Sequence, residues 1–475
     1  MRYCILGAGM QGAVAASMLA RDPERPHVLL CDVDFERARH VAAHIGCERV
    51  EAATVDATDA ASLVAAMRDC DMVLDLVFFE LAGGVRRAAL EAGCHYVNSA
   101  ADSRFLEAIA FEHVVPDDEA FRAAGLCAVA CCGWAPGVTN VLARSVADKL
   151  DEVEGLQLRI GFDKALWADP SEIAHPFRPH ASPEVVLGDF GDKSLHFTGG
   201  KPIEVPPFAL TESFDFGGAI GKLCITSHCH DEPYTLPVLV GKALRECAFR
   251  YPVNDRAATL VAMGMGDPRR VVSLPDGSTV KPFDVVMALV ERPADHTVLG
   301  ETREGVARAR DTDRAVVVEA SGRKDGQARR IRLNWYVHDG AELRTRLFEA
   351  FGSAQIWVAL PMIVAAGMIL RGELPRGSSC PNSSIPDASS TTSQHWGTRS
   401  SSRWRRSQRR LARGAPKPRG DLAESPVTGV TNSPMDASHR VGGANGRSAP
   451  ALAAGSGALA TRSDTAARRD DRSRS

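Results

Sequence analysis

The sequence predicts an α/β protein in which an N-terminal doubly wound parallel sheet is joined to an α+β second domain and followed by a disordered C-terminal tail. Three observations predict this class. Short apolar runs alternate with helical stretches over the first 130 residues, which is typical of parallel strands covered on both faces. After about residue 150, strand-like runs pair across turns instead. Beyond residue 372, Ser, Arg, Pro and Gly dominate and no hydrophobic period remains.

The N-terminal elements alternate strictly between strand and helix. The predicted strands are 3–6, 27–31, 50–55, 72–79, 95–97 and 127–130, and the predicted helices are 11–20, 35–44, 60–68, 82–92 and 119–124. Because right-handed helical crossovers join neighbouring strands, the sheet is expected to be parallel. We therefore predict a Rossmann domain over residues 1–140.

Residues 141–349 are predicted to form the α+β domain. A strand is expected at 156–162. Pro275-Asp276-Gly277 separates two short runs and indicates a hairpin. The runs 315–320 and 330–337 flank a turn at 322–326 and are expected to pair antiparallel. The apolar stretch Ala354–Leu370 is short and contains Pro361, so we interpret it as a buried helix rather than a membrane span.

Composition and charge exclude several classes of protein. The chain has 475 residues, of which 45% are hydrophobic and 24% charged, as in a soluble globular protein. Residues 1–375 hold 39 Lys and Arg against 52 Asp and Glu, so this part is acidic and predicts no nucleic-acid partner. The 12 cysteines include no CxxC pair and no zinc spacing. We expect reduced thiols, no metal site, no membrane contact and a cytoplasmic location.

The low-complexity tail, residues 374–475, has two interpretations. It is basic, because residues 376–475 hold 17 Lys and Arg against 7 Asp and Glu, and such composition is typical of disorder. The alternative is a shifted reading frame. Read one base earlier, serine codons of the TCN type encode apolar residues. The stretch from Gly377 to Gly397 then begins Val-Val-Leu-Pro and continues with a helical period. The nucleotide sequence of related loci would decide between the two.

A glycine-rich turn follows the first predicted strand. Gly7-Ala8-Gly9-Met10-Gln11-Gly12 stands where that strand meets the first helix, which is the context that makes a GxGxxG motif informative. Gly7 permits a tight turn, Gly9 lets a diphosphate approach the backbone, and Gly12 lets the helix pack closely on the strand. The free N–H groups at the helix start, at Met10 and Gln11, would then bind phosphate.

Acidic residues at the ends of the next two strands indicate the rest of a dinucleotide site. Asp32 ends the second strand, 20 residues after Gly12, where a carboxylate binds the ribose hydroxyls of NAD and repels the extra phosphate of NADP. Asp34 strengthens this prediction, and Asp56-Ala57 is expected at the adenine edge. Nearby Arg37 and Arg39 leave NADP as an alternative cofactor. Asp32 could instead cap a helix.

Later segments resemble a known family. Ala89–Asn98 is similar to its "AAIEAGxHYVD" segment, and Gly133-Trp134-Ala135-Pro136-Gly137-Val138-Thr139-Asn140 to its "GLxPGxxN" turn. The chain thus resembles the saccharopine dehydrogenase-like family over about residues 1–375, nearer to its lysine 6-dehydrogenase-type branch. The resemblance implies NAD(P)-linked oxidation of an amino-acid C–N bond, or the reverse imine reduction. It also implies a helix within 350–373 that returns to the nucleotide domain, and a homodimer.

The catalytic candidates lie at the strand ends and in the densest polar cluster of the second domain. Glu80 and Asn98 follow predicted strands, and Glu80 is our candidate for the substrate ammonium. His228 or His230 is expected to accept a proton, oriented by Asp231. Arg250 is the candidate for a substrate carboxylate. The histidines could also be surface residues or metal ligands, and Arg250 a structural ion pair.

Three functions remain open from the sequence. The first is an NAD(P)-dependent oxidoreductase that acts on an amino acid. The second is a dinucleotide-binding sensor or scaffold without catalysis. The third is a reductase that condenses an amine with a keto acid.

Overall fold

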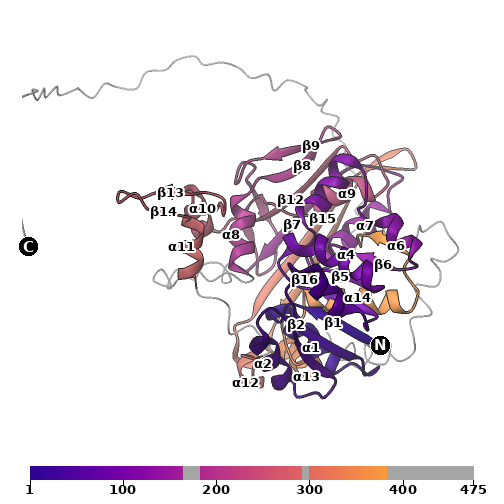
Figure 1. Ribbon diagram of the computed structural model, residues 1–475. Helices are drawn as coiled ribbons and strands as arrows, with labels where there is room; N and C mark the ends of the chain where they lie inside the picture. Colours follow the sequence, from indigo (N-terminus) through magenta and orange to yellow (C-terminus); the bar gives the residue numbers. More distant parts are fainter. Residues whose placement is uncertain (164–181, 291–298, 382–475) are drawn as a thin grey trace, which may run out of the picture. The chain divides into compact units, whose positions relative to one another are not determined.

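The computed structural model describes residues 1–163, 182–290 and 299–381. Its N-terminal sheet has seven strands in the order β17-β6-β5-β4-β1-β2-β3, and every neighbouring pair is parallel (Figure 1). The order reverses between β1 and β4, as in a doubly wound fold. The predicted Rossmann sheet is therefore confirmed. Its strands are β1 (Arg2–Leu6), β2 (His27–Asp32), β3 (Val50–Thr54), β4 (Met72–Asp75), β5 (His95–Asn98), β6 (Cys127–Val129) and β17 (Gly377–Ser379).

Helices cover both faces of this sheet. Successive residues of β1 therefore pack alternately into two apolar layers, one on each face. Tyr3 and Ile5 pack with one layer, and Cys4 and Leu6 with the other. The first layer holds α1 (Met10–Ala20), α2 (Phe35–Ile45), α13 (Ala341–Phe351) and α14 (Ala359–Leu370). The second holds α3 (Ala60–Met67), α4 (Ala82–Ala92) and α6 (Asp118–Ala123). The 3₁₀ turn η1 (Phe79–Leu81) follows β4, and α5 (Ser103–Glu107) with the π-helical segment η2 (Ala108–Glu112) follows β5.

The apolar stretch near residue 360 is the helix α14, which packs on α1 and β5. It begins at Ala359 and not at Ala354, so Pro361 lies in the first turn. Proline is tolerated there because the N–H groups of the first turn have no partner within the helix. None of the helices in the described ranges is long and apolar enough to span a bilayer.

The chain continues into the N-terminal sheet after α14, although the sequence predicted a structureless tail from residue 374. Residues Gly377–Ser379 form β17, which pairs with β6. Gly377 N donates to Leu126 O, and Ser378 N donates to Asp118 Oδ1 at 2.9 Å. Backbone pairing makes this strand, which is why no hydrophobic pattern marked it. Residues 382–475 of the predicted tail lie outside the described residues.

The second sheet is mixed, with the order β10-β11-β12-β7-β15-β16, and β8 with β9 attached to β12. Only β12 and β7 form a parallel pair among these strands of the described chain. The strands are β7 (Glu152–Phe162), β8 (Ser194–Thr198), β9 (Lys201–Val205), β10 (Glu212–Asp215), β11 (Lys222–Ser227), β12 (Glu246–Pro252), β15 (Thr312–Lys324) and β16 (Gln327–Asp339).

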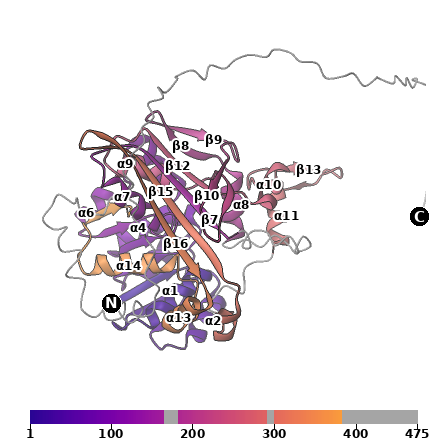
Figure 2. The ribbon, with the colours of Figure 1, turned by 180° about the vertical axis from the view of Figure 1, so that it is seen from behind.

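The hairpin of β15 and β16 is longer than predicted, and Figure 2 shows its two strands side by side. Asp325 and Gly326, both with positive φ, form the turn. Gly322, which suggested the turn in the sequence, lies inside β15 at a bulge. There a Cβ would stand 1.9 Å from Glu152 O, so this glycine serves a close backbone approach.

Helices of the second domain pack on one face of this sheet or extend from it. They are α7 (Val138–Ala147), α8 (Pro183–Gly191), α9 (Glu232–Leu239), α10 (Asp255–Ala262) and α11 (Pro282–Leu289). Helix α12 (Arg303–Arg308) instead packs on α13. The predicted hairpin around 275–277 is the short pair β13 (Val272–Ser273) and β14 (Thr279–Val280). The α+β character of the second domain is thereby confirmed.

Candidate functional site

The glycine turn between β1 and α1 has the geometry that the motif predicted. Gly7 has φ +92, and a Cβ on it would stand 2.7 Å from Leu76 O. A Cβ on Gly12 would stand 1.7 Å from Gly7 O. Gly9 is exposed, and a Cβ there would meet nothing within 4 Å. Packing therefore requires two of the glycines, and the third faces open space.

The start of α1 fits a dinucleotide diphosphate. Gly9 is the N-cap of α1, no side chain caps the helix there, and the first turn of α1 holds no acidic residue. The backbone N–H groups of Met10, Gln11 and Gly12 would hold the phosphates, helped by the positive end of the helix. Gln11 Oε1 is buried and has no hydrogen-bond partner in the described part of the chain. An uncapped helix start beside open space is what an anion needs.

Two of the predicted acidic residues have backbone partners. Asp32 is 9% exposed. Its carboxylate accepts hydrogen bonds from Ala8 N at 2.8 Å and from Asp34 N at 2.9 Å, which ties the end of β2 to the glycine turn. Asp34 caps α2 and accepts from Arg37 N. Asp32 thus stands at the predicted place and also has a structural role.

The predicted adenine edge lies after β3. Asp56 is exposed and accepts from the N–H and hydroxyl of Thr58, and the hydroxyl bond lowers its pKa. Ala57 is half-buried and packs against the layer of α3 and α4. Val55 N, just before them, donates to Asp32 O at 3.0 Å, so both residues lie beside the end of β2 at the carboxyl edge of the sheet.

Arg37 is expected to decide between NADP and NAD. Its guanidinium is 56% exposed and lies 3.9 Å from both Asp32 and Asp34, beyond ordinary hydrogen-bond distance. Arg37→Ser should weaken NADPH binding about tenfold, because a phosphate loses a charge-assisted partner, and should leave NADH binding within about twofold. Fluorescence titration measures both. Arg39→Ser is the control, since Arg39 pairs with Glu36. Equal losses for both cofactors would contradict this role.

A buried carboxylate and an imidazole meet at the start of α9. Glu232 is fully buried; Oε1 accepts from Thr139 Oγ1 at 2.5 Å, and Oε2 lies 2.5 Å from His230 Nδ1. The side chain of His230 is 12% exposed, and its ring stacks on Phe249 at 4.1 Å. Glu232 therefore fixes the orientation of the ring and leaves Nε2 as the nitrogen available to another group.

Charges around His230 are almost all negative. Burial opposes protonation of the ring, but Glu232, Asp231 and Asp189 together raise its pKa to about 9. Burial raises the pKa of Asp189 to about 7 and that of Asp231 to about 6, against the effect of His230. At neutral pH the imidazole is consequently a cation that holds a proton.

The same shifts predict how stability depends on pH. Because the folded protein binds the His230 proton more tightly than the unfolded chain, this stabilisation is complete below pH 6.5. It is lost as pH rises to about 9, a loss on the order of 2–3 kcal/mol. Urea unfolding between pH 6.5 and 9.5 measures it. Glu232→Gln should flatten this slope, and an identical slope in both proteins would contradict the pairing.

The two predicted histidines are neighbours, with ring centres 6.0 Å apart, but their partners differ. His228 is 6% exposed and lies between Tyr251, at 4.7 Å, and Phe190, at 4.6 Å between ring centres, so it belongs to a ring stack. Asp231 does not orient His230 at Nδ1. Its carboxylate accepts from Ala101 N at 3.3 Å and from Cys131 Sγ at 3.4 Å.

Arg250 lies away from the histidines. It stands opposite Ser227 in the β11–β12 pair, whereas its neighbour Tyr251 points to the other face with His228. Arg250 donates to Gln157 Oε1 at 2.6 Å and pairs with Glu212 at 3.6 Å. The structure therefore does not bring Arg250 together with His228 and His230.

Glu80 and Asn98 both lie at the carboxyl edge of the N-terminal sheet. Glu80 is exposed in η1 and accepts from Ser103 Oγ at 2.5 Å. Asn98 is buried and its Oδ1 accepts from Cys131 N at 3.0 Å. Asn98 thus ties the ends of β5 and β6 together, beside the residues that contact Asp231.

Sequence reasoning missed Thr139, Glu232 and Asp189 as members of this group. Thr139 belongs to the quoted 133–140 turn and Glu232 follows Asp231, so both lie in segments that the sequence singled out, but neither was assigned a function. Asp189 lies on α8, some 40 residues earlier, and no motif marked it. Across the described ranges, no group of three His, Cys, Asp or Glu side chains could hold a metal ion.

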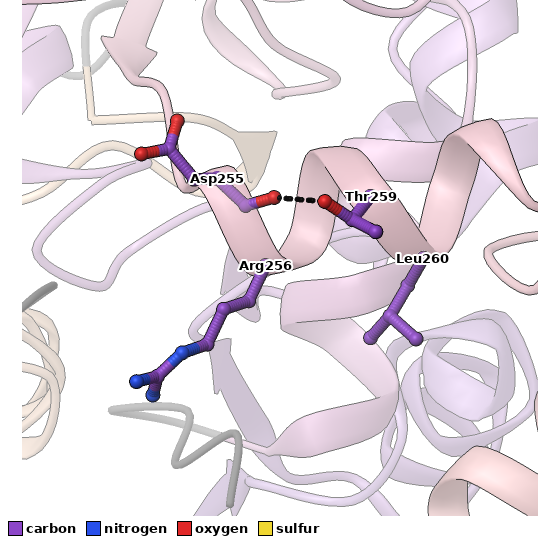
Figure 3. A pocket seen from close by; sticks show the side chains of 4 residues that line it. All are labelled: Asp255, Arg256, Thr259 and Leu260. Carbon is purple, nitrogen blue, oxygen red and sulfur yellow. Dashed lines mark hydrogen bonds between the residues drawn. The ribbon is translucent and has the colours of Figure 1, made fainter. Parts of the chain in front are cut away.

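A separate pocket lies on α10 (Figure 3) and is lined by Asp255, Arg256, Thr259 and Leu260. Thr259 Oγ1 donates to Asp255 O at 2.8 Å within the helix. None of the residues singled out from the sequence lines this pocket, so we assign it no role.

Fold and turn together define a Rossmann-type dinucleotide-binding protein with a second, mixed-sheet domain. Residues 3–129 match the family described as "Saccharopine dehydrogenase NADP binding domain". This match confirms the resemblance of residues 3–129 to saccharopine dehydrogenases and a nicotinamide dinucleotide as the cofactor. The preference between NAD and NADP, and the place near the lysine 6-dehydrogenase-type branch, stay predictions.

Similar proteins extend the likeness beyond this domain. The chain is 23% identical to carboxyaminopropylagmatine dehydrogenase of Synechocystis sp. over 382 residues, 78% of this chain and 89% of that protein. It is 25% identical to carboxynorspermidine synthase of Vibrio cholerae over 53% of this chain and 56% of that protein.

Solved structures show the same fold. Saccharopine dehydrogenase (L-Glu forming) from Saccharomyces cerevisiae matches with a TM-score of 0.54 at 13% identity, over 83% of this chain and 98% of that one. Homospermidine synthase from Legionella pneumophila, solved in complex with NAD, matches with a TM-score of 0.52 at 11% identity, over 80% of this chain and 86% of that one.

Proposed function

We propose that this protein is an NAD(P)-dependent oxidoreductase that acts on the C–N bond of an amino acid. One observation carries the proposal: the His230–Glu232 pair stands beside the carboxyl edge of the dinucleotide-binding sheet. Its neighbour Asp231 contacts Ala101 and Cys131, which follow β5 and β6. Ligands of doubly wound sheets bind outside this edge.

A bound nicotinamide dinucleotide supplies the acceptor or donor of two electrons. The residues of this chain supply the proton. His230 holds its proton at neutral pH, because Glu232 and two aspartates raise its pKa to about 9. It is therefore suited to donate a proton from Nε2 to the substrate nitrogen during imine reduction. In the oxidative direction His230 would accept that proton, which requires a pH near or above 9.

The condensation of an amine with a keto acid, followed by reduction of the imine, is the second candidate. The relative named carboxynorspermidine synthase favours it, and the protonated state of His230 suits reduction in either case. Product mass separates the two candidates, since condensation joins two carbon skeletons and amine oxidation releases ammonia.

A change in nicotinamide absorbance, measured with both cofactors and a panel of amines, amino acids and keto acids, tests the proposal. Turnover of an amino substrate supports it. Binding of NADH without turnover on any compound would instead favour the sensor or scaffold. The division into residues 1–140 with a returning helix and 141–349, the homodimer and the cytoplasmic location stay predictions.

A further inference from the structure

We infer that Arg314, and not Arg250, binds a carboxylate of the substrate, so that the protein recognises a molecule with both an amine and a carboxylate. The inference rests on the proposed function and adds the residue that binds the carboxylate of the substrate. Arg314 lies on β15, and nothing in the sequence distinguished it from the other arginines.

Arg314 lies on the same face of the second sheet as the histidines. It stands opposite Phe162 in the β15–β7 pair. The ring of Phe162 lies 5.5 Å from that of Tyr251, which in turn stacks on His228. Arg314 and the histidines therefore border one continuous row of rings.

Three tryptophans bring this row to the nucleotide domain. Trp134, from the turn after β6, lies 5.8 Å from Phe162 and 6.4 Å from Trp335. Trp357, two residues before α14, lies 6.5 Å from Trp335, and the Arg314 guanidinium stands 4.9 Å from the Trp357 ring centre. Arg314 thus lies between the second sheet and the segment that enters α14.

This segment places Arg314 near the carboxyl edge of the dinucleotide-binding sheet. Cys132, three residues after β6, contacts Pro361 O in the first turn of α14 through its Sγ at 3.7 Å. Asp231 contacts Cys131, the residue before Cys132. Arg314 and the acidic side chains around His230 therefore both lie near the residues that follow β6. A substrate must reach the dinucleotide at this edge of the sheet.

The guanidinium keeps unused donors. Its side chain is 14% exposed, and Nη2 donates to Asp339 Oδ2 at 2.7 Å. Within the described ranges, Nε is buried without a hydrogen-bond partner. A buried guanidinium with an unpaired N–H is costly, and a carboxylate is the group that satisfies two of its donors at once. Arg250 Nε is also buried without a hydrogen bond in this part of the chain, but Arg250 lies on the opposite face, where it donates to Gln157 and pairs with Glu212 at 3.6 Å.

The two ends of this row differ in charge. Asp189, Asp231 and Glu232 lie around His230 at one end, and Arg314 stands at the other. An amine suits the first end and a carboxylate the second, which is the charge pattern of an amino acid in its zwitterionic form.

Binding of 5-aminovalerate and of its neutral amide, 5-aminovaleramide, tests the inference. Tryptophan fluorescence reports binding, because Trp357 lies against Arg314 and the row continues through Trp335 to Trp134. Wild-type protein should bind the acid at least about tenfold more tightly than the amide, since a charge-assisted bidentate pair is lost with the amide. Arg314→Gln should bind both equally. Arg332→Gln is the control, because Arg332 lies over Phe214 and bonds Asn334, and it should discriminate like the wild type.

The double variant Arg314→Met with Asp339→Leu guards against a folding defect, since removing both partners of a buried pair leaves no unpaired charge. It should also lose discrimination. Equal binding of acid and amide by the wild type, no saturable binding of the acid, or discrimination that persists without Arg314 would overturn the inference. The titration uses no dinucleotide, so its outcome is independent of NADH binding and turnover, whose failure would remove the proposed function instead.

Discussion

Gly9→Val should abolish dinucleotide binding and leave the protein folded. Gly9 has φ −71 and ψ −167, an extended conformation that any residue adopts, and an added Cβ would meet no protein atom within 4 Å. The valine methyls would instead occupy the space that the diphosphate needs above the start of α1. We expect NADH affinity to fall by about 100-fold or more, measured by fluorescence titration, with an unchanged circular dichroism spectrum.

Gly12→Ala is the contrasting variant. Its Cβ would stand 1.7 Å from Gly7 O, so the helix could not keep its place against the strand. We expect a lowered Tm rather than a selective binding defect. NADH affinity of Gly9→Val close to that of the wild type would contradict the position of the diphosphate.

Turnover should fall by about 10² to 10⁴ in His230→Gln, because that range is typical for loss of a general acid or base. Glutamine retains hydrogen bonding and volume but does not titrate. The fall should appear in kcat, with NADH binding unchanged, since His230 lies in the second domain. Steady-state kinetics with the best substrate of the amino-acid panel measures it.

Glu232→Gln should shift the pH profile rather than abolish turnover. Without this carboxylate the pKa of His230 is expected to fall from about 9, so that reductive turnover declines at lower pH than in the wild type. His196→Gln is a matched control, since His196 is also buried and its pKa is lowered to about 4 by burial and by Arg250. Unchanged turnover in His230→Gln, or an equal loss in His196→Gln, would exclude the proposed role of His230.

The nucleotide domain could be predicted because its signals are local. Buried parallel strands read as continuous apolar runs, and Gly7, Gly9 and Gly12 each answer a requirement of one turn. The strand β17 escaped prediction because Gly377–Ser379 has neither an apolar run nor an alternation, and only backbone pairing with β6 defines it. Helix α14 was predicted, but from Ala354, whereas it begins at Ala359. Pro361 then lies in the first turn, where a proline is tolerated.

The second site depends on contacts between distant residues, which the sequence does not display. His230 and Arg250 both looked plausible, but the face of β12 on which a residue lies follows from strand register. Glu232 and Thr139 are 93 positions apart and meet only when α7 and α9 pack together. Arg314 carried no motif, and its place beside Trp357 arises because the chain returns to the first domain.

The edge strand β17 has a practical consequence for any shortened form of this protein. A chain cut after Glu373 would remove the strand that pairs with β6 on the side away from β5, together with the acceptor of the Ala130 N–H. It would also remove the buried Cys380 and so uncover Ala130 and Cys131, which belong to the same apolar cluster. An unprotected strand edge promotes aggregation. Expression trials should therefore retain the residues through Pro381, even though Ser378 Oγ is buried without a partner in the described chain.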